Sequence, residues 1–347
     1  MSEPPLPSRR RRGRLFRFGA AFVVMLAVAG YLVVQYVTGG GRGPGCKVVS
    51  AKGDGATYEF TPEQAVNAAT ITAVGTARDL PERAVTIALA TALQESTLYN
   101  IDYGDRDSLG LFQQRPSQGW GTPEEIMDPV YSAEKFYEGL EKVPGYTRLP
   151  LTVAAQKVQR SGFPQAYAKH EPDAALLAAA LTGRSGATLT CEGRPGASRA
   201  SGTEAVQAAL ARDFGRDLIQ PAGAEVDEPA GAEADGTAGA EAGDAPRPTP
   251  SPSAPDVTVE PDGRTLTLPV DDGRDGAAGG SRRAGTRGWQ LAHWAVANAS
   301  QLRIQRVSYA GRVWVAGTTD STWRQDDAKG SGTSADGPDR VRITTGR

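Results

Sequence analysis

The sequence has no large excess of charge of either sign. Its 347 residues include 38 Lys and Arg against 40 Asp and Glu, which gives a formal net charge of −2 at pH 7. Without a global basic field, a nucleic-acid-binding role has no compositional support. Apolar residues make up a modest 39%, whereas 42 Gly and 24 Pro are present. The length allows about two domains of roughly 150 residues each, but much of the chain is not core-forming.

Long hydrophobic runs are lacking, except near the N-terminus. Phe18 to Val37 is a charge-free apolar run of about the 20 residues needed to cross a bilayer. It follows the Arg-rich stretch Ser8 to Arg14, which should stay in the cytoplasm. We therefore expect a basic cytoplasmic segment at 1–14 and an uncleaved transmembrane signal anchor at 15–37. The bulk of the chain would then lie outside the cell membrane.

The alternative is a cleaved signal peptide, with Ala27-Val28-Ala29 as the cleavage triplet. The apolar run continues past this triplet, where a cleaved signal would already have turned polar, and this favours the anchor. Transport has no support, because a single span without an ionisable residue offers no pathway.

Cysteine is scarce, and its two positions are informative. Cys46 and Cys191 bracket the helical region, and both lie beyond the hydrophobic run. In an extracytoplasmic compartment such a pair is expected to form one disulfide. Closing so long a loop would contribute about 4 to 5 kcal/mol through the denatured state. The alternative is two unrelated buried thiols.

Helical patterns dominate the residues between the cysteines. Thr61-Pro62-Glu63-Gln64 is a strong helix start, with a hydroxyl N-cap, Pro in the first turn and Gln three residues after the cap. A second helix is expected from Leu80 to Glu95. Further helical patterns follow at 123–127, 129–143, 151–160 and 164–181, and the last is expected to be interrupted at Glu171-Pro172. We therefore predict a mainly α fold, with a spacer and lead-in at 38–60 and a helical domain at 61–191.

The remainder is predicted to be less regular. Residues 192–256 read as a linker with one helix at 203–218, followed by a disordered acidic Ala/Gly/Pro tract. Strand-like alternation and a further helix predict a small α+β module at 257–324. The tail at 325–347 is polar and is predicted to be disordered.

Glu95 is the first candidate for chemistry. On a helix it continues the line of Ala84, Ala88 and Ala92, so it can point towards the core at the end of the element. Partial desolvation raises the pKa of a carboxyl and lets it keep a proton near neutral pH. A general acid for glycosidic cleavage needs that property. The alternative for a helix-terminal Glu is a solvated charge.

Two motifs around Glu95 carry a family resemblance. A helix ends in Glu95-Ser96, and a loop then leads to Gly110-Leu111-Phe112-Gln113. This arrangement resembles the catalytic region of the lysozyme-like soluble lytic transglycosylase superfamily, in which a Glu-Ser pair precedes a Gly-Leu-Met-Gln motif. The likeness covers about residues 61–181. It implies a lysozyme-like fold, with Glu95 as the acid/base and Gln113 lining the glycan cleft.

The sequence departs from that family at a third motif. The family's Ala-Tyr-Asn-x-Gly segment is replaced by Val158 to Gly162. The Tyr of that segment normally helps to position the acid, and it has no clear counterpart here. Tyr103, Tyr131 and Tyr167 remain as candidates.

The number of carboxylates decides the expected mechanism. A hydrolase of this type usually needs a second carboxylate, and Asp102, Asp105 and Asp107 lie in the loop after Glu95. The alternative is that Asp105-Arg106-Asp107 is a local salt-bridged loop anchor. A transglycosylase manages with Glu95 alone, because the 6-hydroxyl of the sugar attacks and water is not required. We therefore favour the non-hydrolytic route.

Residues of the kind that bind sugars lie next to both motifs. The run from Gln113 to Trp120 supplies amides, a guanidinium and an indole, which suit sugar hydroxyls and ring faces. The candidate substrate-binding residues are Ser96, Gln113, Gln114 and Trp120. The alternative for Trp120 is that it packs a tight turn with Pro116.

Histidine is scarce, which limits metal chemistry. The segment 288–324 resembles the C-terminal part of small domains related to zinc D-Ala-D-Ala carboxypeptidases and hedgehog-like proteins. The metal-binding segment of those domains corresponds here to 263–267, with Thr267 at the position of an Asp ligand. The only histidines are His170 and His293, and zinc needs three protein ligands. We expect a degenerate module without metal or other cofactor, in which His293 is structural or at the surface.

Three functions follow from these patterns. The first is a membrane-anchored, lytic transglycosylase-like enzyme that cleaves the glycan strand of peptidoglycan. The second is a non-catalytic peptidoglycan-binding membrane protein with an incomplete lysozyme-like site, and the third is a membrane scaffold. The expected partners are glycan strands and the cytoplasmic membrane, and the sequence indicates no particular protein partner.

Overall fold

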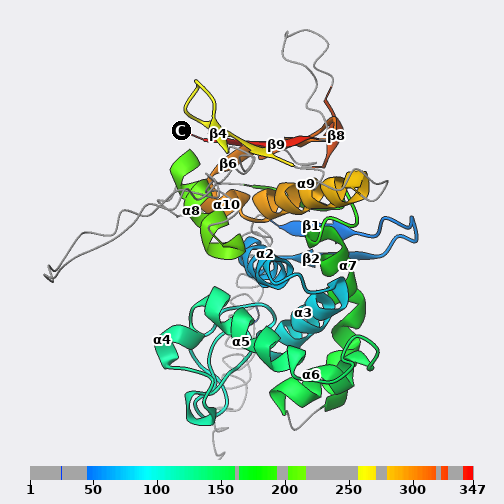
Figure 1. Cartoon of the computed structure of the whole chain (residues 1–347), viewed down its shortest axis with the longest axis vertical. Coiled ribbons are helices and arrows are strands. Elements are labelled where there is room, and N and C mark those ends of the chain that lie inside the picture. Colours follow the sequence, from blue (N-terminus) through cyan, green and yellow to red (C-terminus); the bar gives the residue numbers. More distant parts are fainter. Residues whose placement is uncertain are drawn as a thin grey trace, which may run out of the picture. The chain divides into compact units, whose positions relative to one another are not determined.

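The segments predicted to lie at and within the membrane are outside the part of the chain that the structure describes. The computed structural model describes Met25 and residues 45–160, 164–193, 202–215, 257–270, 280–317, 322–326 and 339–346 (Figure 1). The chain divides into two units, 1–43 and 44–347. Apart from Met25, the predicted segments 1–14 and 15–37 therefore have no structural account. Among the described helices, none has the length and apolarity to span a bilayer.

A three-stranded antiparallel sheet joins the beginning and the end of the helical region. β1 (Cys46–Val49) lies between β2 (Thr57–Phe60) and β3 (Leu189–Cys191). Cys46 and Cys191 face each other in the β1/β3 register and form a buried disulfide. The predicted disulfide is therefore confirmed. Because it spans 145 residues of sequence, it restricts the unfolded chain strongly.

Two long helices follow β2. α2 (Pro62–Ala77) begins with a complete capping box, in which Thr61 and Gln64 each accept a hydrogen bond from the other's backbone N–H. α3 (Glu82–Ser96) is buried along most of its length, as expected for a helix that is apolar on nearly all sides. It ends where Thr97 adopts the left-handed conformation, with a φ of 54°.

Shorter helices complete the helical region. Helix α7 (Glu171–Leu181) packs along α3, and helix α5 (Pro129–Glu141) packs on α2. The predicted interruption at Glu171-Pro172 is confirmed, because a 3-10 helix ends there and α7 begins. The elements are η1 (Pro116–Gln118), α4 (Pro123–Ile126), α5 (Pro129–Glu141), α6 (Leu151–Gln159), η2 (Pro164–His170) and α7 (Glu171–Leu181).

The contact between α2 and α5 depends on a glycine. Tyr137 of α5 is fully buried, and its hydroxyl donates to the carbonyl oxygen of Ile71 at 3.0 Å. A Cβ at Gly75 would come within 2.6 Å of that hydroxyl. Any larger residue at position 75 would therefore separate the two helices.

Helix α8 (Thr203–Phe214), predicted at 203–218 as the one helix of the linker 192–256, packs into the core. The Asp213 side chain has no exposed surface. It accepts hydrogen bonds from Thr70 Oγ1 of α2 at 3.3 Å and from Trp294 Nε1 at 2.8 Å. The amphipathic pattern revealed the helix but not its partners. The acidic tract predicted to follow α8 lies outside the described residues.

The C-terminal part forms a six-stranded antiparallel sheet in the order β4-β5-β9-β6-β7-β8. Figure 1 shows α9 (Gly280–Ala297) between this sheet and the helical region. α9 contacts β6 and β9 as well as α7 and β3. A short α10 (Ala299–Leu302) follows it. The strands are β4 (Thr258–Val259), β5 (Thr265–Pro269), β6 (Ile304–Tyr309), β7 (Arg312–Val315), β8 (Arg324–Gln325) and β9 (Arg340–Thr345).

The prediction of a disordered tail at 325–347 is wrong for β9. This strand pairs with β5 on one side and with β6 on the other, near the middle of the sheet. Val341, Ile343 and Thr345 are buried, and the residues between them are half-buried. The alternation of buried and more exposed residues covers only the six residues of β9. Because the surrounding sequence is polar, so short a pattern did not predict a strand.

The predicted C-terminal module shares its core with the helical region. Gln290 of α9 donates to Thr76 Oγ1 of α2 at 2.6 Å. Trp314 of β7 is fully buried and donates to the carbonyl oxygen of Cys191 at 3.0 Å. A fold with a mainly helical region and a small antiparallel sheet at the C-terminus is confirmed, but residues 44–347 form one compact unit.

Candidate functional site

Glu95 lies in the last turn of α3 and lines an open cleft. Its side chain is neither fully buried nor fully exposed. Burial raises the pKa of the Glu95 carboxyl from its ordinary value of 4.5, while hydrogen bonds from Tyr167 and Gln159 act in the opposite direction. The two effects have different causes, because desolvation disfavours the carboxylate whereas the donors stabilise it.

Tyr167 is the tyrosine that contacts the candidate acid. Its hydroxyl donates to Glu95 Oε1 at 2.6 Å, and its side chain is fully buried in η2. Tyr103 is 70% exposed, and the hydroxyl of Tyr131 lies close to Gly121. The structure therefore separates three tyrosines that the sequence left equivalent.

Gln159 is a member of the site that sequence reasoning did not single out. It is the last residue of α6. Its Nε2 donates to the carbonyl oxygen of Phe112 at 2.6 Å. α6 is thereby tied to the Gly110-Leu111-Phe112-Gln113 turn, close to Glu95.

Ser96 supports the cleft from the core. It is buried, and its hydroxyl lies within hydrogen-bond distance of the carbonyl oxygens of Ala92 at 3.1 Å and Leu111 at 2.8 Å. It therefore fastens the end of α3 to the loop that carries the second motif. Ser96 is not among the residues that line the cleft, and its predicted role in substrate binding stays a prediction.

Gln113 and Gln114 follow each other but are placed differently. Gln113 is half-buried, and its Nε2 lies 3.3 Å from the carbonyl oxygens of Tyr103 and Gly110. A Cβ at Gly104 would come within 2.7 Å of the backbone carbonyl oxygen of Ser108 as well as close to the Gln113 side chain, so a larger residue at this position would require the backbone to shift. Gln114 is 1% exposed and donates to the carbonyl oxygen of Ser132 at 3.0 Å. Both line the cleft, but the side chain of Gln114 is largely committed to the core.

The cleft has a volume of about 1110 Å³ and is open to solvent. Trp120 is half-buried in its wall, and its ring lies near Gly139 of α5. The loop between α3 and η1 contributes one part of the lining, and α5 and α6 contribute another. The lining residues are Glu95, Asp105, Arg106, Ser108, Gln113, Gln114, Arg115, Gln118, Trp120, Gly139, Lys142, Val143, Lys157, Val158, Gln159 and Arg160.

The three candidate second carboxylates are not equivalent. Asp107 pairs with Arg115 at 2.7 Å and accepts from the backbone N–H of Ser117 at 2.8 Å. Hydrogen bonds to Ser117 and Arg115 hold the pKa of Asp107 well below its usual range, which fits the loop-anchor alternative. Asp102 is exposed and is not part of the lining, whereas Asp105 is exposed and lines the cleft.

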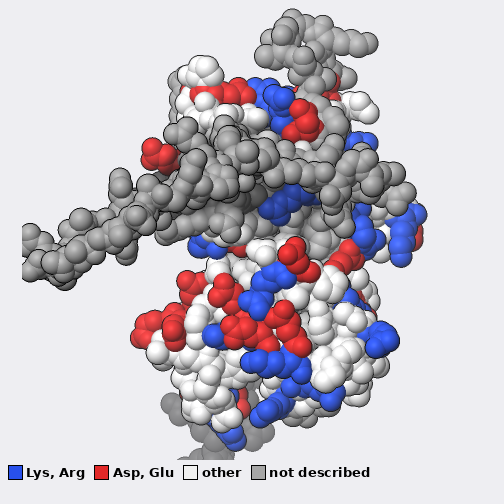
Figure 2. Space-filling view, in the orientation of Figure 1, with Lys and Arg blue, Asp and Glu red and all other residues white. Residues whose placement is uncertain are grey.

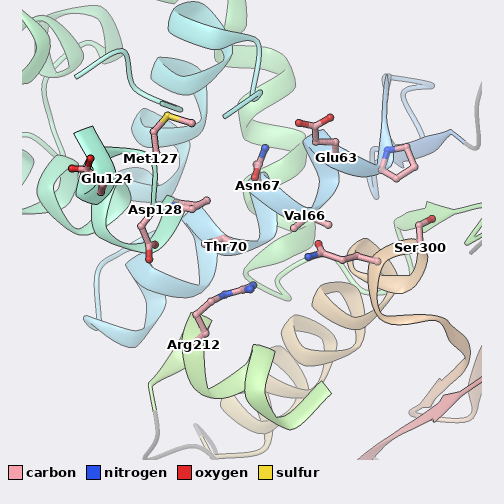
Figure 3. A pocket seen from close by; sticks show the side chains of 12 residues that line it. Glu63, Val66, Asn67, Thr70, Glu124, Met127, Asp128, Arg212 and Ser300 are labelled. Carbon is pink, nitrogen blue, oxygen red and sulfur yellow. The ribbon is translucent and has the colours of Figure 1, made fainter. Parts of the chain in front are cut away.

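A second cavity of about 850 Å³ lies between α2, the α4–α5 junction, α8 and α10. Figure 3 shows Arg212 reaching from α8 towards Thr70 of α2, with Asp128 beside them. Asp128 serves as the N-cap of α5, and Glu63 and Glu124 are exposed at the rim. The cavity contains none of the residues selected from the sequence.

The C-terminal residues considered for metal binding have internal partners. Thr267 Oγ1 donates to Glu260 at 3.1 Å. His293 is fully buried, with its Nδ1 at 2.7 Å from the carbonyl oxygen of Ala180. Burial lowers the pKa of His293 to about 4, so the neutral ring donates to this carbonyl. In the part of the chain that the structure describes, no three His, Cys, Asp or Glu side chains form a group suited to a metal ion.

The structure thus defines a helical protein with a partly buried carboxyl group in an open cleft and a C-terminal sheet packed against the helices. A family model described as "VldE, C-terminal domain" matches residues 255–336. The match covers most of the C-terminal sheet but not β9, and it does not extend to the cleft. No curated protein matches the chain.

Proposed function

We propose that the protein cleaves the glycan strand of peptidoglycan in the manner of a lytic transglycosylase, with Glu95 as the single general acid/base. The observation that carries this proposal is the Glu95–Tyr167 contact of 2.6 Å at the wall of an open cleft. Because burial raises the pKa of Glu95, the carboxyl keeps its proton to higher pH than an ordinary Glu. A protonated carboxyl in a cleft can donate to a bridging oxygen.

In the proposed mechanism, Glu95 acts first as an acid and then as a base. It protonates the bridging oxygen as the glycosidic bond breaks, and the leaving strand departs with that proton. The resulting carboxylate, stabilised by the donors Tyr167 and Gln159, then accepts the proton of the sugar's 6-hydroxyl. That oxygen attacks the anomeric carbon and forms a 1,6-anhydro ring, so water is not consumed.

The placement of the other carboxylates supports this non-hydrolytic route over hydrolysis. Asp107 is engaged by Arg115 and Ser117, and Asp102 does not line the cleft. Asp105 does line it, and it is the one of the three that a hydrolytic mechanism would use. The nature of the product therefore distinguishes the two routes.

We further propose that the protein works at the outer face of the cytoplasmic membrane, held by the anchor predicted at 15–37. The Cys46–Cys191 disulfide supports this location, because structural disulfides persist in oxidising compartments. Fractionation of cells followed by alkaline extraction would test the anchor. A chain that is released without detergent would contradict it.

The proposed activity is tested by digesting purified peptidoglycan with the full chain and analysing soluble products by mass spectrometry. Anhydro-muropeptides are expected from the wild type, and Glu95→Gln should abolish their release. Glu59→Gln, which changes an exposed residue of β2, is the matched control and should release as much as the wild type. Undiminished release by Glu95→Gln would remove Glu95 from the mechanism.

Two other outcomes would select different functions. Products with reducing ends would indicate hydrolysis and direct attention to Asp105. No release, combined with retention of the protein on sedimented wall material, would indicate a peptidoglycan-binding protein without catalysis.

A further inference from the structure

The cleft around Glu95 is lined by basic side chains that have no acidic partner among the described residues. Its lining includes four exposed basic residues, Arg106, Lys142, Lys157 and Arg160. Within the described part of the chain, none of the four lies within ion-pair distance of a carboxylate. Other basic residues of the helical region do pair in this way, as Arg78 does with Glu141 at 2.6 Å. The cleft therefore carries uncompensated positive charge on a chain that is slightly acidic overall.

These cations come from both parts of the lining. Lys142 caps the C-terminus of α5, while Lys157 and Arg160 lie at the end of α6. Arg106 belongs to the loop between α3 and η1, where it has a positive φ of 59°. Figure 2 shows Lys and Arg atoms near α6 and Asp and Glu atoms over α4, with atoms of both kinds side by side between them.

The acidic groups of the cleft are too few to neutralise these cations. The charge of Arg115 is balanced by Asp107. Burial favours the neutral form of Glu95, which leaves Asp105 as the remaining acidic residue in the lining. Helix C-termini favour basic residues for reasons unrelated to ligands. That effect explains in part why basic residues lie at the ends of α5 and α6. It does not explain Arg106, which lies in the loop between α3 and η1.

We propose that the cleft selects glycan strands that carry carboxylates over neutral strands with the same type of backbone. The carboxylates would lie beside these basic residues while the sugar rings contact Gln113 and Trp120. They come either from the lactyl group of a muramic acid whose peptide has been removed or from the attached peptide itself. The proposal rests on the proposed function in that it takes a glycan strand as the ligand, but it concerns binding and not cleavage.

Binding is measured with the full chain carrying Glu95→Gln, so that no ligand is consumed. Trp fluorescence reports binding of three probes, namely N-acetylglucosamine hexamer, glycan fragments with free lactyl carboxylates, and glycan fragments with intact peptides. At low salt we expect at least one anionic probe to bind about fivefold or more tightly than the neutral hexamer, from several contacts with exposed cations. The preference should nearly disappear at about 1 M salt, where the Debye length is about 3 Å.

The anionic probe that shows the preference identifies the source of the carboxylate. The double variant Lys157→Gln/Arg160→Gln should lower this preference several-fold. The matched control is Lys47→Gln/Lys52→Gln, which removes two exposed lysines on and after β1 and should leave the preference unchanged. Thermal unfolding of both double variants verifies that each is folded.

Equal affinity for neutral and anionic probes would overturn the inference, as would an equal loss of preference in the cleft and control variants. These results are separable from a failure of the proposed function. A wild-type protein that prefers anionic strands but releases no product would contradict cleavage alone. One that cleaves peptidoglycan but does not distinguish the probes would contradict charge selection alone.

Discussion

The Tyr167 hydroxyl offers a direct test of the site, because Tyr167→Phe removes one hydrogen bond and keeps the buried ring. The hydroxyl donates to Glu95 Oε1 at 2.6 Å. A donor to a carboxylate stabilises the ionised form, and its loss therefore raises the pKa of Glu95 further. Burial continues to act in the same direction after the substitution, and Gln159 remains as the opposing donor.

The size of the effect follows from the type of bond. A hydrogen bond to a charged group contributes about 1.5 to 3 kcal/mol. Glu95 is only partly buried, and water reaching the carboxylate would replace part of the lost interaction. We therefore expect the ionised form to lose an amount near the lower end of that range.

The assay is a 13C NMR titration of the side-chain carboxyl of Glu95 in the full chain. The pKa of Glu95 is expected to be higher in Tyr167→Phe than in the wild type, and the alkaline limb of peptidoglycan cleavage should move to higher pH with it. Tyr103→Phe is the matched control, because the Tyr103 side chain is 70% exposed and does not line the cleft. An unchanged or lowered pKa of Glu95 in Tyr167→Phe would refute the proposed role of this hydrogen bond.

Two further predictions concern stability. Folding raises the pKa of Glu95 above 4.5, so the stability it contributes is complete below that pH and is lost as the pH rises through the folded-state pKa. In urea denaturation, the stability of Glu95→Gln relative to the wild type should therefore increase from pH 4.5 towards neutrality, and a pH-independent difference would contradict this. Asp213→Ala leaves the donors of Trp294 and Thr70 buried without their acceptor, and we expect the free energy of unfolding to fall by about 3 kcal/mol. Arg212→Gln removes only the half-exposed partner and should cost much less, so equal losses in the two variants would argue against a buried network around Asp213.

Local features of the helical region were predictable because their causes are local. The capping box at Thr61 and the break before α7 depend on residues a few positions apart. The disulfide was predictable from the scarcity of cysteine and from the expected compartment. The same local pattern placed Glu95 at the end of its helix.

Several members of the site were not predictable in this way. Tyr167 is separated from Glu95 by 72 positions, and nothing in the sequence distinguished it from Tyr103 or Tyr131. The contacts of Ser96 were not predictable either, since its hydroxyl lies against the carbonyl groups of Ala92 and Leu111. These partners are brought together by packing between helices. Such contacts between distant segments cannot be predicted from the local patterns of a single sequence.

The sequence and the tertiary structure therefore determined different features of this protein. The sequence by itself determined which segments are helical, where the disulfide forms, and that a carboxyl group ends an apolar helix. The tertiary structure alone decided that α8 is buried, that β9 completes a sheet, and that Tyr167 and Gln159 reach the same carboxyl. The physical reason is range, because caps and turns act over a few residues, whereas burial and side-chain hydrogen bonds depend on segments that are distant in sequence.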